Sequence, residues 1–151
     1  MEKEADLVIA SCGGYPKDIN VYQLQKTMDN AWCAVRKGGV VIILGECAEG
    51  SGSATYEKTM QQYTTPEQVE TAVRADFQIG AHKAFAVTRL MKKAHFILVS
   101  SMPPELARLL LFTPAKDMEE AMKIAMNTLG MSQPRIILMP MGSITVPLIN
   151  K

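Results

Sequence analysis

The stretch DLVIASCGGYPKDINVYQLQKTMDNAWCAVRKGGVVIILGEC, residues 6–47, decides the fold of this chain. Its first six residues form an apolar run that ends at Cys12-Gly13-Gly14, which predicts a buried strand and a turn. Apolar residues then recur at helical spacing from Ile19 to Arg36, which predicts a helix with one buried face and Asp18 as its N-cap. After Gly38-Gly39, the apolar run Val40–Cys47 predicts a second strand that is buried on both faces, as in a parallel sheet.

The rest of the chain continues this alternation of strands and helices. Alternation at this spacing predicts an α/β layered domain, Rossmann-like, with a mostly parallel sheet of about four strands covered by helices, and residues 1–151 form this single domain. Two further strands are expected at His95–Ser101 and Arg135–Pro140. Further helices are expected at Tyr56–Tyr63, at Pro66–Phe77 with Thr65 as N-cap and Gln68 as its capping partner, at His82–Lys93, at Pro103–Leu110 and at Ala115–Leu129.

Composition excludes several classes of protein. Hydrophobic residues make up 48% and charged residues 21% of the 151 residues, which is ordinary globular usage and excludes disorder. A net charge of +1 does not supply the basic field that nucleic acid or an anionic membrane attracts, so neither partner is expected. The longest apolar run, Val40–Leu44, is far short of the ~20 residues of a spanning helix. The charged start shows no signal peptide, and three cysteines without a CxxC pair favour reduced thiols, so a cytoplasmic protein is expected.

Chemistry in an open parallel sheet gathers beyond the carboxyl ends of the strands. None of the loops there carries GxGxxG or GxxxxGK[ST], so the glycines of these loops are equally well explained as tight turns. No GxSxG elbow supports nucleophilic hydrolysis, and two histidines thirteen residues apart without a Cys/His cluster predict no metal site. The loops expected beyond the carboxyl ends of the four strands are Cys12–Lys17, Glu46–Ser53, Ser100–Pro104 and Pro140–Ser143.

The polar face of the Ile19–Arg36 helix is the strongest candidate site. At ~100° per residue, Gln23, Lys26 and Asn30 lie opposite the apolar stripe, and Gln23 and Lys26 are neighbours in the first turns. An amide and an ammonium near a helix start can bind a carboxylate with the support of the helix dipole. On composition alone, a solvated polar face is the favoured interpretation.

A second polar face belongs to the helix expected at His82–Lys93. There His82, Phe85 and Arg89 share one side, opposite the apolar residues. An outward phenylalanine flanked by polar residues indicates a covered surface rather than open solvent, although a singly exposed aromatic residue is common.

Residues 13–26, GGYPKDINVYQLQK, resemble the pattern GGxPxDxNxYQxxK of the nickel-dependent lactate racemase family. Similarity to that family's C-terminal domain covers nearly the whole chain. It continues through Glu46–Gly50, Gly80–Ala84, Pro103–Leu106, Gly130 and Met139-Pro140.

The resemblance implies one half of a two-domain enzyme, a racemase or epimerase that interconverts 2-hydroxy acids by reversible hydride transfer through a 2-keto acid. It implies that the N-terminal domain of the same protein holds the cofactor, a nickel pincer nucleotide, together with the histidine bases, and that this domain alone is inactive. Gln23 and Lys26 match the family's substrate-contacting glutamine and lysine, so they are expected to hold the substrate carboxylate and to offset charge on the keto intermediate.

The sequence departs from the family at two positions. His82-Lys83 stands about where lactate racemases tend to carry a tryptophan that faces the substrate, and Met141 stands where relatives often have histidine. His82 is therefore a candidate substrate contact, and the hydroxy acid is open between lactate and another member of the class. The alternative function is a freestanding α/β module that binds an anion or a protein. A nicotinamide dehydrogenase is the weakest alternative because the dinucleotide fingerprint is missing.

Overall fold

Five strands form a single parallel sheet in the computed structural model, which describes residues 3–75 and 81–148. Every neighbouring pair of strands is parallel, and the order across the sheet is β4-β3-β2-β1-β5. The α/β class and the parallel sheet agree with the expectation from the sequence. The strands are β1 (Ala5–Ser11), β2 (Val35–Leu44), β3 (His95–Val99), β4 (Thr113–Ala115) and β5 (Ile136–Met139).

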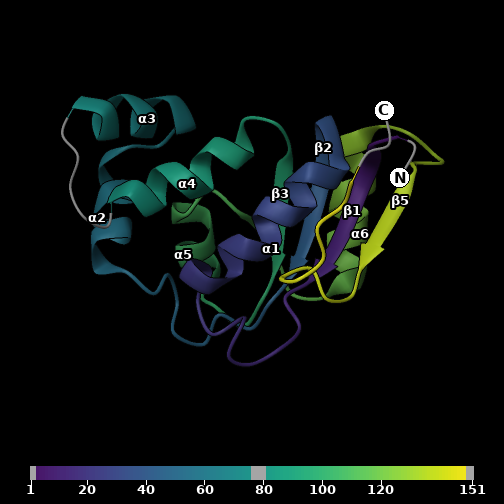
Figure 1. The fold of residues 1–151 in the computed structure, drawn as a ribbon, viewed down its shortest axis with the longest axis horizontal. Coiled ribbons are helices and arrows are strands. Elements are labelled where there is room, and N and C mark those ends of the chain that lie inside the picture. The colour runs from purple at the N-terminus through teal and green to yellow at the C-terminus, as the bar shows by residue number, and fades with distance from the viewer. Residues whose placement is uncertain (1–2, 76–80, 149–151) are drawn as a thin grey trace.

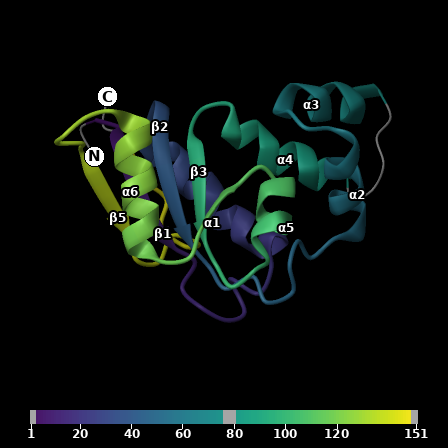
Figure 2. The ribbon, with the colours of Figure 1, turned by 180° about the vertical axis from the view of Figure 1, so that it is seen from behind.

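Helices cover the two faces of this sheet unequally (Figure 1 and Figure 2). α1 (Val21–Ala34) packs directly on one face, and the core on this side extends through α4 (Ala81–Met91) and α5 (Pro104–Leu109) to α2 (Ala54–Gln62) and α3 (Pro66–Ala75), which pack on α4 beyond the sheet (Figure 1). Within the described residues, α6 (Met118–Leu129) alone packs on the other face. No helix in the described ranges has the length and apolar composition that crossing a bilayer requires.

The central strand β2 is buried on both faces, as its unbroken apolar run predicts. Val41 and Ile43 belong to the core under α1 to α5, whereas Val40 and Ile42 belong to the core under α6. This alternation follows from the two-residue repeat of a strand, in which successive side chains point to opposite faces.

The start of α1 differs from the expectation. Asn20, rather than Asp18, is the N-cap, because its side-chain oxygen accepts a hydrogen bond from Gln23 N at 3.0 Å. Asp18 lies before the helix, where its carboxylate accepts from Glu46 N at 3.3 Å. The expected N-cap was therefore wrong by two residues, and the helix begins at Val21.

Strand boundaries differ in two places for physical reasons. β2 begins at Val35, which is both the extended C-cap of α1 and the first residue of the strand, and not at the expected Val40. The short edge strand β4 was not expected: Ala115 belongs to it, and α6 begins only at Met118, after the N-cap Asp117. A strand of three residues carries too little periodicity to be recognised in a sequence.

The other expected elements are present with shifted ends. α3 begins at Pro66 as expected, and Thr65 accepts from Gln68 N at 3.3 Å. The Gln68 side chain returns to Thr64 N rather than to Thr65 N. The expected end of this helix at Phe77 lies outside the described residues.

Candidate functional site

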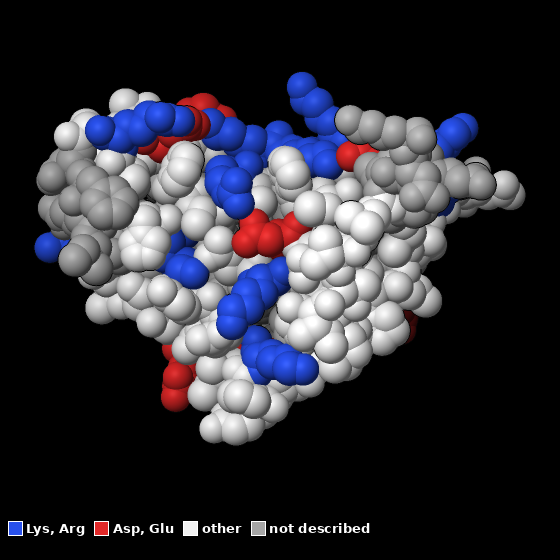
Figure 3. Space-filling view, in the orientation of Figure 1, with Lys and Arg blue, Asp and Glu red and all other residues white. Residues whose placement is uncertain are grey.

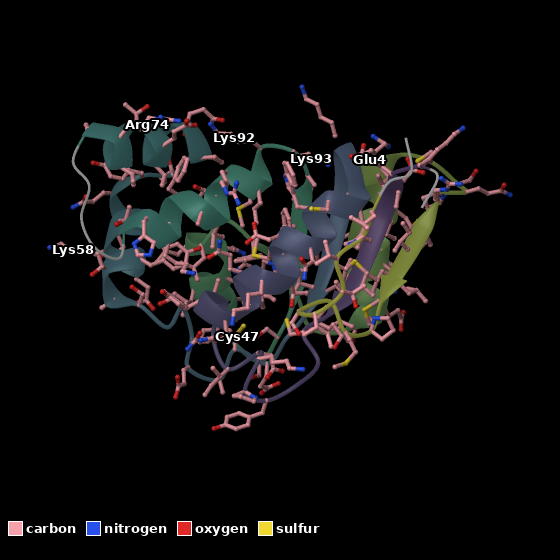
Figure 4. The ribbon with its side chains drawn as sticks, in the orientation of Figure 1. Glu4, Cys47, Lys58, Arg74, Lys92 and Lys93 are labelled. Carbon is pink, nitrogen blue, oxygen red and sulfur yellow. The ribbon has the colours of Figure 1, made fainter. Side chains whose placement is uncertain are left out.

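The loops after β1, β2, β3 and β5 meet at one edge because these strands are parallel. The loop after β1 joins the loop after β2 through the bond from Cys47 N to the Asp18 carbonyl oxygen at 2.8 Å. Ser100, after β3, donates its hydroxyl to the Glu46 carbonyl oxygen at 2.6 Å. Ser143, after β5, donates to the Cys12 carbonyl oxygen at 2.8 Å. The four loops therefore form one connected edge, where Cys47 is labelled in Figure 4.

The first turn of α1 is fixed against this edge. The first two amides of the helix, Val21 N and Tyr22 N, donate to the carbonyl oxygens of Gly50 and Ser51 at 3.0 and 3.1 Å. Since Asn20 caps the third amide, a ligand here meets side chains rather than free backbone N–H groups. The loop approaches so closely that a Cβ on Gly52 would lie 2.5 Å from the Asn20 side chain.

Gln23 and Lys26 lie together on α1, as their spacing predicts. Lys26 donates from Nζ to Gln23 Oε1 at 3.1 Å. Lys26 is exposed and makes no ion pair with any described residue, so its ammonium has N–H groups left for an anion. Because the Gln23 oxygen is occupied by Lys26, the Gln23 amide nitrogen is the group left to donate. The two side chains therefore present donors suited to one carboxylate.

His82 lies in the first turn of the neighbouring helix α4 and is half-buried. The residue after it, Lys83, connects α4 to α1. Its Nζ lies 2.5 Å from Gln25 Oε1, 3.5 Å from the Tyr22 carbonyl oxygen and 3.6 Å from the centroid of the Tyr22 ring. The structure thus brings α4 against the flank of α1 that carries Tyr22 and Gln25, next to the face with Gln23 and Lys26.

Lys83 is a charged residue that sequence reasoning did not select. Burial lowers the pKa of Lys83; the nearby Asp29 acts in the opposite direction, and Lys26 adds to the lowering. Its partners Tyr22 and Gln25 lie three residues apart on α1, so the sequence contained a cation-binding pair but no indication that α4 would face it.

The outward face of α4 is covered by the chain itself. The Arg74 guanidinium of α3 lies 5.9 Å from the Phe85 ring centroid. Arg89 pairs with Asp29 of α1 at 2.9 Å. Phe85 is half-buried and packs against the core, which explains why this helix carries an aromatic residue among polar ones.

The described residues do not fit a nickel ion. Within 3–75 and 81–148, no group of three His, Cys, Asp or Glu side chains comes close enough to hold a metal. Burial raises the pKa of Cys12 to about 11 and that of Cys47 to about 12, so these thiols stay protonated near neutral pH. A protonated thiol is a poor metal ligand because the thiolate is the binding form.

Basic side chains gather over α1 and the loop that precedes it (Figure 3). Lys17, in that loop, is half-buried, and its Nζ lies 3.7 Å from the position of a Cβ on Gly13. Lys17, Lys26 and Lys83 make no ion pair within the described ranges, so their ammonium groups are not neutralised by direct contact with a carboxylate, although Asp18, Glu46 and Glu49 lie in the same loops. Ammonium groups in this state can each bind an anion.

The chain is similar in sequence to two lactate racemases. The lactate racemase from Thermoanaerobacterium thermosaccharolyticum is 36% identical over 128 residues, which cover 82% of this chain and 30% of that protein. The lactate racemase from Lactiplantibacillus plantarum is 28% identical over 127 residues, with coverage of 81% and 30%. This chain thus spans about a third of the length of these relatives.

Solved structures show the same fold. The structure of the Thermoanaerobacterium thermosaccharolyticum lactate racemase apoprotein matches with a TM-score of 0.90 and 33% identity, over 97% of this chain and 36% of that one. A Thermotoga maritima protein matches with a TM-score of 0.55 at 13% identity, over 95% of this chain and 36% of that one, which is a likeness of fold alone. The sequence model described as the lactate racemase C-terminal domain matches residues 1–146. The chain therefore belongs to the lactate racemase C-terminal domain family.

Proposed function

We propose that this chain is the substrate-binding C-terminal domain of a nickel-pincer-dependent racemase or epimerase that acts on small 2-hydroxy acids. The remainder of the longer protein, its N-terminal domain, would carry the cofactor and the bases. The observation that carries the proposal is the Lys26–Gln23 pair on the carboxyl edge of the sheet, which presents an amide and an ammonium that has no ion-pair partner among the described residues.

Lys26 and Gln23 have distinct tasks in this proposal. Lys26 binds one carboxylate oxygen of the substrate through a charge-assisted hydrogen bond, and the Gln23 amide nitrogen binds the other. Because Lys26 already holds the Gln23 oxygen at 3.1 Å, the amide is oriented before the substrate arrives. The pair lies in the first two turns of α1, next to the loops at the carboxyl edge.

The proposal limits this domain to binding and orienting the substrate. Its described residues offer no donor set for nickel, so no chemical step is assigned to a metal held here. His82 remains a candidate contact on α4, because Lys83 beside it reaches α1. The hydroxyl and the side chain of the hydroxy acid would face the remainder of the protein.

The test uses the full-length protein loaded with its cofactor. Chiral chromatography would follow the interconversion of the two enantiomers of lactate and of other short 2-hydroxy acids. We expect Lys26→Ala to lower kcat/KM by about 100-fold or more, because loss of one preorganised charged contact typically costs that much. Lys26→Arg should recover part of the loss, because it keeps the charge but not the position.

Lys123→Ala is the matched control, because Lys123 is an exposed lysine on α6, on the opposite face of the sheet. It should leave kcat/KM unchanged. Thermal unfolding of each variant would separate lost binding from lost folding. Near-normal turnover by a folded Lys26→Ala protein would refute the carboxylate-binding role. Anion binding without turnover of any hydroxy acid by the full-length protein would instead favour the binding-module alternative.

A further inference from the structure

The face of the sheet under α6 is incompletely covered. Ala121 and Ala125 of α6 pack on Leu7, Val40, Ile42 and Ile97 of the inner strands. Figure 2 shows β5 beside α6, at the outer edge of the sheet, rather than beneath it. Parallel sheets normally have both faces covered, so a parallel strand with one open face indicates a missing neighbour.

The side chains on the open face of β5 are apolar. Ile136 lies level with Leu7, and Leu138 lies level with Ile9, so both point to the α6 side of the sheet. Leu7 is fully buried, whereas Ile136 is 42% and Leu138 is 68% exposed. The α6 side of the sheet is therefore buried at β1 but exposed to water at the neighbouring strand β5.

The residues after β5 extend this apolar surface to the α1 side. They run back past α1 (Figure 1), where Asn30 Nδ2 donates to the Gly142 carbonyl oxygen at 2.7 Å. Ile144 and Val146 in this segment are 67% and 62% exposed. Figure 3, which views the α1 side, shows a surface with few charged side chains where this segment runs. Several large apolar side chains exposed around one edge strand mark an interaction site.

We infer that the rest of the longer polypeptide packs on a surface formed by Ile136, Leu138, Ile144 and Val146, here called the β5 flank. Two observations favour an occupant on the same chain. The lactate racemase apoprotein contains this domain within a chain of which it covers only 36%. The Asn30–Gly142 bond also ties the β5 flank to the helix that carries Gln23 and Lys26, so one body packed here would be held next to the candidate site.

A second copy of the chain is the competing occupant, since β5 is an edge strand. A covalently linked partner has a high effective concentration, so the modest area of the β5 flank suffices for stable packing within one chain. The inference rests on the proposed function in one respect: the body that packs here is the one that faces Gln23 and Lys26.

The test measures thiol protection in the full-length protein. Leu138→Cys and Val146→Cys would each be labelled with a thiol reagent in native buffer and in urea, with rates determined for the relevant peptide by mass spectrometry. Lys58→Cys is the control, because Lys58 is exposed at the opposite end of the domain (Figure 4). We expect Leu138→Cys and Val146→Cys to label about 100-fold more slowly in native buffer than in urea, whereas Lys58→Cys labels at nearly equal rates.

Comparable protection factors at all three positions would overturn the inference. Protection of Leu138→Cys and Val146→Cys that disappears on dilution, together with a fall in molecular mass by light scattering, would assign the β5 flank to a second copy and overturn it too. The readout does not use activity. A Lys26→Ala protein that turns over normally while Leu138→Cys stays protected would refute the proposed function and leave this inference standing.

Discussion

Lys83 is an unusual residue because a charged group is partly removed from water without a carboxylate partner. Among the described residues its ammonium contacts only neutral groups: Gln25 Oε1, the Tyr22 carbonyl oxygen and the Tyr22 ring. Burial therefore lowers the pKa of Lys83 below the ordinary lysine value. A cation held in this way beside Lys26 increases the local positive potential that an incoming carboxylate meets.

Replacement of Lys83 by methionine removes the charge and keeps most of the side-chain length. In the full-length enzyme we expect KM for the hydroxy acid to rise about two- to fivefold with kcat unchanged, because the lost Coulomb term across solvent is about 0.5–1 kcal/mol. Steady-state kinetics would measure it, with Lys83→Arg as the charge-retaining control. A fall in kcat at constant KM would instead assign Lys83 a role in the reaction.

The lowered pKa also gives a pH dependence with a definite sign. Lys83 loses its proton at a lower pH than an ordinary lysine, so wild-type KM should rise as the pH increases through that pKa, below 10.5. The Lys83→Met enzyme has no such proton to lose and should lack this rise. Identical alkaline profiles for the two enzymes would contradict the prediction.

At the scale of elements, the start of α1 is what positions the candidate site. Asn20 accepts from Gln23 N, and the Asn20 amide lies 3.4 Å from Glu49 Oε2 in the loop after β2. Asn20 thus contacts the loop after β2 and also caps the helix that carries Gln23 and Lys26. Its side chain fits against Gly52, where a Cβ would clash with it.

Asn20→Ala should therefore cost about 1 kcal/mol of unfolding free energy, because a capping oxygen is lost. Asn20→Ser keeps a capping oxygen and should cost less. Urea unfolding followed by the fluorescence of Trp32, the single tryptophan, would measure both. Equal stability of the alanine and serine variants would show that the cap contributes little.

Periodicity predicted the long elements well and the local ones poorly. The helix that became α1 and the strand that became β2 carry many apolar residues in a regular pattern, so their existence followed from the sequence. The N-cap was wrong because Asp18 and Asn20 are both good capping residues, and the choice depends on a loop 28 residues away. β4 escaped notice because three residues cannot display a period.

The candidate site shows the same division. The neighbour relation of Gln23 and Lys26 is a property of one helix, and the sequence predicted it correctly. The contact of Lys83 with Tyr22 joins residues 61 positions apart along the chain, and no local pattern encodes it. The covering of Phe85 by Arg74 likewise required knowledge of how α3 and α4 pack.

At the scale of the whole molecule, the carboxyl edge of the sheet, where the strands end, and the amino edge, where they begin, have different roles. The carboxyl edge carries the candidate site, whereas the amino edge carries ion pairs that join elements. Lys93 pairs with Glu4 at 2.9 Å, and Lys92 lies between α4 and α3 with Glu70 as its partner. Figure 4 shows these lysines along the edge opposite Cys47.

At the amino edge, Asp6 of β1 links its own strand to β2 and to the start of β5. Its carboxylate lies in β1, accepts from Arg36 Nε of β2 at 2.5 Å, and accepts from Arg135 N before β5 at 2.8 Å. The hydrogen bond from Arg36, followed by that from the Arg135 backbone, holds the pKa of Asp6 below its ordinary value. The folded state therefore favours the ionised form of Asp6 more strongly than the unfolded chain does.

The sign of the resulting pH dependence follows directly. Because the folded-state pKa of Asp6 is lowered, its stabilisation is complete above the unfolded value of 3.8 and is lost as the pH falls through the folded pKa. Asp6→Asn should cost about 1–2 kcal/mol at pH 7, after allowance for the partial exposure of Arg36. The difference from wild type should shrink as the pH falls below the unfolded value. Urea unfolding between pH 7 and pH 2.5 would measure it.

Glu119→Gln is the matched control, because Glu119 is an exposed carboxylate whose pair with Lys123 lies within one helix. It should change the unfolding free energy by no more than about 0.5 kcal/mol at any pH. If Asp6→Asn behaved like Glu119→Gln, the three strands would be held by packing alone, and the amino edge would not depend on Asp6. A difference that stayed constant from pH 7 to pH 2.5 would show that the Asp6 carboxylate stabilises the sheet through its shape and not through its charge.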